Sequence, residues 1–189
     1  MIIIGILGDI GSGKSFVSKQ FGYPVFNADN EVVKIYRNDK TCFAKLKKIL
    51  PKYIEKFPID KTELTNAILK NKKNIKKISK IVHPFVRKKM NFFFLKNKRK
   101  KVVILDVPLL LENNIKKKNM ILVFVDSKKS DISSRLSKRK SFNDEIFKRL
   151  KEIQLPLDYK KRKSQYIIKN HYTKKNVRKS VKNLLKMIL

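Results

Sequence analysis

The chain has 189 residues, enough to bury a sizeable core in one compact domain, and 42% of them are hydrophobic. No stretch reaches the roughly 18 consecutive apolar residues that a membrane span needs, so we expect no membrane partner. The lone cysteine, Cys42, excludes an intramolecular disulfide and suits a reducing compartment. We therefore expect a cytoplasmic protein, and we expect it to act as a monomer.

The net charge needs a separate interpretation. It is formally +33, from 48 basic and 15 acidic residues, which would suit a nucleic-acid-binding protein. Most of the basic residues, however, are lysines spread along the whole chain beside abundant Ile and Asn, which indicates biased genome composition. Recognition of phosphates and bases favours arginine, so we expect no specific nucleic-acid partner. A basic field would still attract anionic substrates.

The first predicted element is a strand over residues 1–7, where an almost continuous apolar run is typical of a strand buried on both faces. The run lacks a basic n-region and a cleavage site, so we expect it to belong to the fold and not to a signal peptide. Residues 8–15 follow as Gly-Asp-Ile-Gly-Ser-Gly-Lys-Ser, a full G-x-x-x-x-G-K-[ST] phosphate loop. Residues 15–21 then read as the opening of a helix that Gly22 closes.

Strand, glycine-rich loop and helix in this order predict binding of a nucleoside triphosphate. The glycines let backbone N–H groups surround a phosphate, Lys14 reaches the β and γ oxygens, and the Ser15 hydroxyl can ligate Mg²⁺. The expected nucleotide-binding residues of this segment are Gly8, Asp9, Ile10, Gly11, Ser12, Gly13, Lys14, Ser15 and Phe16.

Short apolar strands alternate with longer helical patterns along the rest of the chain. The further predicted strands are residues 24–27, 101–105, 120–125 and 166–168. This alternation predicts an α/β fold of three layers around a parallel sheet of the P-loop NTPase type. We expect one domain of this P-loop type over residues 1–189, made of a core (1–30, 101–127 and 164–189), a helical substrate-binding insertion (about 31–100) and a helical lid (about 128–163).

Carboxylates follow two of the predicted strands. Asp29 comes just after the strand at 24–27, and Asp106 follows the strand at 101–105. The carboxyl ends of parallel strands share one edge of the sheet, where ligands bind. A carboxylate there can accept a proton from an attacking hydroxyl or hold Mg²⁺. Either residue alone would more often be a helix N-cap, but two of them around a phosphate loop favour function.

Two pairs of basic residues stand four apart on predicted helices. Arg135 and Arg139 belong to the lid segment and can neutralise charge on a transferred phosphoryl group, although a solvated basic face is the competing interpretation. His83 and Arg87 could meet an anionic substrate, but a lone histidine is more often structural.

Taken together, four ordered segments resemble the dephospho-coenzyme A kinase family, whose discriminating patterns are H-P-x-V-R and D-x-P-L-L-x-E. The segments are residues 8–15, Asn27-Ala28-Asp29, His83-Pro84-Phe85-Val86-Arg87 and Asp106-Val107-Pro108-Leu109-Leu110-Leu111-Glu112. A fifth stretch, Gln154-Leu155-Pro156-Leu157 with Ile167-Ile168-Lys169-Asn170, resembles the family after the lid. The resemblance covers the length of the chain.

The resemblance implies ATP-dependent phosphorylation of the ribose 3′-hydroxyl of dephospho-coenzyme A, giving coenzyme A and ADP in the last step of coenzyme A biosynthesis. It implies that Asp29 is the general base and that Lys14 and Arg139 share in catalysis. It assigns ATP to the phosphate loop with Arg135, and Mg²⁺ to Ser15. The substrate-binding residues that it implies are Asp29, His83, Arg87, Asp106 and Leu109.

The chain departs from the family pattern at a few positions. Asp9 stands where the family has a loop glycine, Asn27 replaces the first carboxylate of D-A-D, and Ser164-Gln165 replaces Ala-Asp before the last strand. Two other hypotheses stay open at this point. One is a different P-loop kinase of nucleotides or metabolites, and the other is a nucleic-acid-binding protein whose triphosphate site is regulatory or vestigial.

Overall fold

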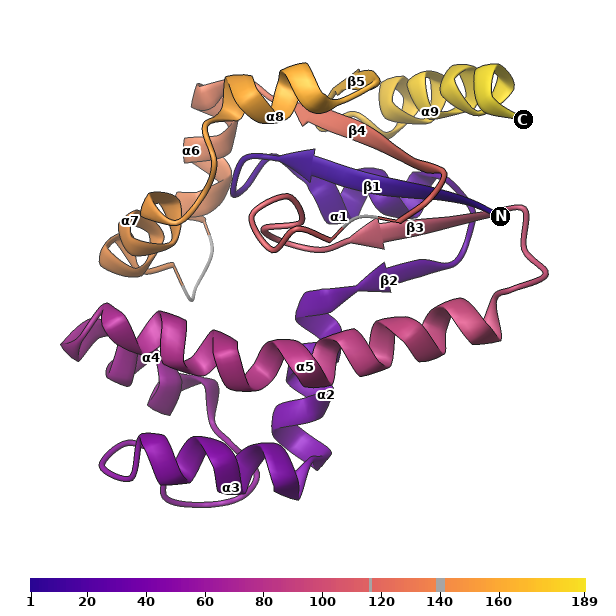
Figure 1. Cartoon of the computed structure of the whole chain (residues 1–189). Helices are drawn as coiled ribbons and strands as arrows, with labels where there is room; N and C mark the ends of the chain where they lie inside the picture. Colours follow the sequence, from indigo (N-terminus) through magenta and orange to yellow (C-terminus); the bar gives the residue numbers. More distant parts are fainter. Residues whose placement is uncertain (116, 139–141) are drawn as a thin grey trace. The chain divides into compact units, whose positions relative to one another are not determined.

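A computed structural model describes residues 1–115, 117–138 and 142–189. The strands of the described residues form a five-stranded, fully parallel sheet with the strand order β2-β3-β1-β4-β5 (Figure 1). The strands are β1 (Ile2–Gly8), β2 (Val25–Asn27), β3 (Val102–Asp106), β4 (Met120–Asp126) and β5 (Tyr166–Lys169). The predicted α/β class is therefore confirmed, and each predicted strand forms within one residue of its expected ends.

The chain divides into two compact units. Unit 1 comprises Met1–Asn27, Asn97–Phe142 and Lys151–Leu189, and it holds the whole sheet. Unit 2 comprises Ala28–Lys96 and Asn143–Leu150 and is all helical. Unit 2 is inserted into the chain mainly between β2 and β3.

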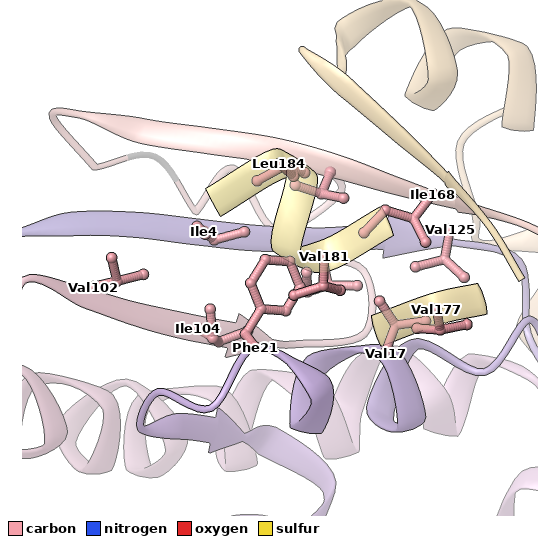
Figure 2. Packing of buried hydrophobic residues seen from close by; sticks show 12 residues of the cluster. Ile4, Val17, Phe21, Val102, Ile104, Val125, Ile168, Val177, Val181 and Leu184 are labelled. Carbon is pink, nitrogen blue, oxygen red and sulfur yellow. The ribbon is translucent and has the colours of Figure 1, made fainter. Parts of the chain in front are cut away.

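The core of unit 1 forms because buried strands present apolar side chains to both sides of the sheet. On one side, α1 (Lys14–Gln20), its C-cap residue Phe21 and α9 (Lys174–Ile188) contribute apolar side chains that face the sheet: Val17, Phe21, Val177, Val181 and Leu184. Figure 2 shows these side chains packed against Ile4, Ile104, Val125 and Ile168. The strand residues that alternate with these are also buried and face the other side: Ile3, Leu7, Val103, Leu105 and Phe124.

The next helices follow β4 in the chain, and most of the second one, up to Leu150, belongs to unit 2. They are α6 (Lys129–Ser137), α7 (Asp144–Glu152) and α8 (Leu157–Lys163), and α8 contacts β1 and β4. No helix in the described part of the chain is long and apolar enough to cross a membrane.

Unit 2 packs four helices around its own core. They are α2 (Ala28–Asn38), α3 (Lys40–Ile49), α4 (Lys61–Lys70) and α5 (Lys73–Lys96), and their buried residues include Ile35, Leu46 and Leu64. Asp39 and Asp60 cap α3 and α4 by accepting backbone N–H bonds, as their position before each helix favours. Arg149 of α7 donates to the carbonyl of Ile68, which joins the segment 143–150 to α4.

Cys42 lies in this core and is fully buried. Burial, with Asp39 nearby, raises the pKa of its thiol to about 11. The thiol therefore stays protonated near neutral pH and acts as a small apolar core group.

Glu112, in one of the segments that carry the family resemblance, forms a buried ion pair with α8 and a hydrogen bond with a second such segment. Lys160 Nζ of α8 lies 2.6 Å from Glu112 Oε1, with only 4% and 11% of the two side chains exposed. The same Glu112 oxygen accepts the backbone N–H of Leu155 at 3.0 Å. Glu112 therefore fixes the chain between α7 and α8 onto the loop after β3.

The variant Lys160→Met should destabilise the fold strongly, because it leaves the Glu112 carboxylate buried without its cation. We expect a loss of about 3–5 kcal/mol in the free energy of unfolding, measured by urea denaturation. The matched control is Lys148→Met, since Lys148 pairs with Asp144 at the same 2.6 Å but with 72% and 63% of the side chains exposed. The control should leave the urea midpoint nearly unchanged. Equal shifts for both variants would contradict the assigned role of burial.

Candidate nucleotide-binding and active site

The phosphate loop joins β1 to α1 through backbone conformations that favour glycine. The φ angles of Gly8, Gly11 and Gly13 are 149°, 84° and 85°, a region that residues with a Cβ rarely adopt. Space is restricted as well, since a Cβ on Gly8 would lie 2.8 Å from the carbonyl oxygen of Val125. The glycine pattern seen in the sequence is thus required by both conformation and packing.

Side chains that follow β4 and β5 donate hydrogen bonds to backbone carbonyls of this loop. Ser127 Oγ and Asn170 Nδ2 both donate to the carbonyl of Ser12, at 2.9 and 2.8 Å, and Asn170 is fully buried. The Tyr172 hydroxyl donates to the carbonyl of Gly11 at 2.9 Å. The C=O and N–H of one peptide point in opposite directions. Hydrogen bonds that hold these carbonyls therefore also set the direction of the N–H groups of the same peptides.

Lys14 and Ser15 follow the loop at the start of α1. The Lys14 ammonium donates to the carbonyl of Asp9 at 2.7 Å and to that of Gly8 at 3.3 Å, so it stays at the loop. Asn27 Nδ2 lies 3.4 Å from Ser15 Oγ. The structure therefore brings the loop, the lysine and the hydroxyl together as the motif predicts.

Asp9 introduces an acid into the loop, and its carboxylate is locally compensated. Oδ1 accepts the backbone N–H of Ile10 at 2.7 Å, and Oδ2 lies 3.3 Å from Lys151 Nζ at the end of α7. The Asp9 side chain is 10% exposed. Lys151 was not predicted as a site residue, because one lysine among so many carries no signal in the sequence.

Asn27 and Asp106 meet at the carboxyl ends of β2 and β3, where the parallel register pairs them. Asn27 Nδ2 donates to Asp106 Oδ2 at 2.5 Å, and Asp106 is 3% exposed. An amide can donate to this buried carboxylate, whereas a second carboxylate at position 27 would repel it. Asn27, which departs from the family pattern, is therefore chemically matched to Asp106 in this chain.

Arg135 and Leu109 belong to unit 1. Arg135 lies on α6 with its guanidinium carbon 4.0 Å from the centre of the Tyr172 ring. Arg139 lies outside the described residues. Leu109, in the turns after β3, has a φ of 57°, and its carbonyl accepts Asn113 Nδ2 at 2.9 Å.

The other predicted site residues belong to unit 2. Asp29 lies in the first turn of α2, which begins directly after β2. His83 and Arg87 lie one turn apart on α5. Burial, followed by the positive charge of Arg87, lowers the pKa of His83 below its usual value. His83 is therefore largely neutral at neutral pH and can offer a hydrogen bond but little positive charge.

The parallel sheet with this strand order, the loop after its first strand and the lysine at the loop define a P-loop kinase. Comparison with known proteins then gives the family. The family described as "Dephospho-CoA kinase" matches residues 2–176, and the chain belongs to this family.

Curated relatives agree with this assignment, and solved structures share the fold. The dephospho-CoA kinase of Wolbachia sp. subsp. Brugia malayi is 34% identical over 97% of this chain and 96% of its own length, and that of Wolbachia pipientis wMel is 33% identical over the same shares. The fold is similar to TT1252 from Thermus thermophilus, with a TM-score of 0.77 at 24% identity over 100% of this chain and 98% of that one. Dephospho-CoA kinase from Campylobacter jejuni gives a TM-score of 0.64 at 21% identity, over 98% and 96% of the two chains.

We predict that Gly13→Ala weakens nucleotide binding. A Cβ on Gly13 would lie 2.4 Å from Asn170 Nδ2, so Asn170 must leave the Ser12 carbonyl. We expect a cost of about 1–3 kcal/mol, which is roughly a 5- to 150-fold loss of affinity. Isothermal titration calorimetry with the nucleotide measures this loss.

Gly22→Ala is the matched control for this experiment. Gly22 also has a positive φ, 72°, but a Cβ there meets nothing within 4 Å. This variant should lose about 1–2 kcal/mol of stability through backbone strain and keep its nucleotide affinity. An unchanged affinity in Gly13→Ala would contradict the assigned role of the Asn170–Ser12 hydrogen bond in nucleotide binding.

Proposed function

We propose that this chain transfers the γ-phosphoryl group of ATP to the ribose 3′-hydroxyl of dephospho-coenzyme A, giving coenzyme A and ADP. Membership of the dephospho-CoA kinase family over residues 2–176 carries this proposal, and an intact, braced phosphate loop supports it. The alternative of another nucleotide or metabolite kinase is not favoured by the relatives.

ATP would bind with its β and γ phosphates in the loop of residues 8–15. The backbone N–H groups of the loop would donate to phosphate oxygens, and the Lys14 ammonium would exchange its backbone carbonyl partners for the β and γ oxygens. Ile10, within the loop, and Phe16, directly after it, belong to this expected contact set. Arg135 would add a positive charge from α6.

Magnesium would be held by Ser15, and the donor set fits a hard cation. Ser15 Oγ and Asp106 Oδ2 both lie within reach of one amide group, that of Asn27, at 3.4 and 2.5 Å. A hydroxyl, a carboxylate and phosphate oxygens are the ligands that Mg²⁺ prefers at phosphoryl-transfer sites. When bound, the ion would neutralise charge on the phosphate oxygens.

Asp29 is proposed as the general base. It would take the proton of the 3′-hydroxyl while that oxygen bonds to the γ phosphorus and the bond from phosphorus to the β-γ bridging oxygen breaks, so that ADP leaves. Arg139, with Arg135, would offset the charge of the transferred group. His83, Arg87, Asp106 and Leu109 are proposed to contact the acceptor substrate.

The proposed arrangement assigns a core, a helical substrate subdomain and a lid to the residue ranges expected from the sequence. We also propose that the protein acts as a monomer in the cytoplasm. Size-exclusion chromatography with light scattering tests the monomeric state.

Coupled ADP release with Mg-ATP, with and without dephospho-coenzyme A at moderate salt, tests the proposed reaction. Stimulation by this acceptor, with coenzyme A as the product, is the expected result. AMP, adenosine and shikimate serve as competing acceptors, since a different metabolite kinase would prefer one of them. Binding of ATP without stimulation by dephospho-coenzyme A would overturn the proposal.

The variant Asp29→Asn should lower kcat roughly 10²- to 10⁴-fold with little change in ATP affinity, because a base acts in the transition state. Its matched control is Glu31→Gln, an acid in the same first turn of α2 that pairs with Lys34 at 2.6 Å. The control should keep near-normal kcat. A near-normal kcat in Asp29→Asn would remove Asp29 from the mechanism.

A further inference from the structure

Tyr172 connects two phosphate-binding features that are far apart in the sequence. It lies between β5 and α9 with a φ of 58°, a left-handed conformation that is uncommon for a bulky residue. Its hydroxyl donates to the carbonyl of Gly11 at 2.9 Å. Its ring lies 4.0 Å from the guanidinium carbon of Arg135.

The backbone of Tyr172 is itself fixed by Asn170. The Tyr172 N–H donates to Asn170 Oδ1 at 2.9 Å, while Asn170 Nδ2 donates to the Ser12 carbonyl. Both polar atoms of this fully buried amide are therefore used, one for the loop and one for Tyr172. The left-handed turn is held in place by the residue that also holds the loop.

The Gly11 peptide is the point where Tyr172 acts on the loop. Its carbonyl accepts the Tyr172 hydroxyl, and the N–H of the same peptide, on Ser12, donates to the Asp9 carbonyl at 3.2 Å. The hydroxyl thus stabilises the turn between Asp9 and Ser12 from outside. Loss of this bond frees the Gly11 peptide to rotate, because glycine tolerates many conformations.

The same surface of the loop lies against the helix that carries Arg135. A Cβ on Gly11 would lie 3.0 Å from Ile132 Cγ2 and 3.1 Å from Leu136 Cγ, both on α6. Ile132 and Leu136 are buried. Arg135 therefore belongs to a helix that packs on the loop, and its guanidinium group lies over the Tyr172 ring.

We propose that Tyr172 is a positioning residue for nucleotide phosphates: its hydroxyl fixes the Gly11 peptide of the loop, and its ring orients Arg135. This inference rests on the proposed function in that ATP is the nucleotide. It predicts two separable contributions, one from the hydroxyl and one from the aromatic face.

Two substitutions separate these contributions. Tyr172→Phe removes the hydrogen bond and keeps the ring, and we expect it to raise the ATP KM about 3- to 10-fold. Tyr172→Leu removes both, and we expect about a 10- to 100-fold rise. The KM for dephospho-coenzyme A should change less than 2-fold, because Tyr172 acts on the nucleotide side.

A double-mutant cycle with Arg135→Ala tests the ring contribution directly. On that background, Tyr172→Leu should raise the KM for ATP by no more than Tyr172→Phe raises it in the wild type, because the ring has lost its cationic partner. The matched control is Tyr159, whose ring also faces a cation, Lys163, at 5.7 Å. Tyr159→Phe and Tyr159→Leu should leave both KM values unchanged.

Calorimetric titration with Mg-ATP repeats the comparison without turnover. If dephospho-coenzyme A fails as a substrate but ATP binding is weakened by Tyr172→Phe and weakened further by Tyr172→Leu, the proposed function is wrong and the inference stands. Unchanged ATP affinity in both Tyr172 variants would overturn the inference. The inference would also be overturned if the Tyr172 variants raised the KM for ATP and the KM for dephospho-coenzyme A equally, with effects that add to the effect of Arg135→Ala. Such a result would indicate a general loss of structure.

Discussion

The site depends on side chains that hold the outer carbonyls of the phosphate loop. A glycine-rich loop is flexible by composition, so its N–H groups form a phosphate site only when the peptides are held in place. Here the Ser12 carbonyl takes two hydrogen bonds and the Gly11 carbonyl takes one, from residues at the ends of β4 and β5. The parallel sheet serves the site in this way, because its register brings β1, β4 and β5 to the same edge.

Local pairing, rather than net charge, sets the electrostatics of this region. Asp9 adds a negative charge to the loop, but Lys151 lies 3.3 Å from its carboxylate. At the next strands, the neutral amide of Asn27 donates to buried Asp106. The departures from the family pattern at Asp9 and Asn27 thus each come with a partner that compensates them. The +33 charge of the chain is a background that attracts anions without selecting among them.

The sequence predicted the fold and the loop because both depend on local patterns. Apolar runs identify the strands, and G-x-x-x-x-G-K-[ST] between the first strand and a helix identifies the loop. The bracing residues Ser127, Asn170 and Tyr172 were not predicted as site residues, because contacts across 115 to 161 positions leave no periodic signal. Glu112 was noted within a motif, but its buried pair with Lys160 appears only in three dimensions. The roles of Asp29, His83 and Arg87 stay predictions.

Binding of Mg-ATP to the wild type, Lys14→Ala and Lys19→Ala, measured by calorimetry at about 0.1 and about 0.5 M salt, tests the central claim that the loop and not the basic surface binds the nucleotide. Lys19 lies on the same helix as Lys14 and is exposed, so Lys19→Ala removes an equal charge away from the loop. The account predicts one site that survives at the higher salt, is kept in Lys19→Ala and is lost in Lys14→Ala. Equal binding by all three proteins that disappears at the higher salt would contradict it.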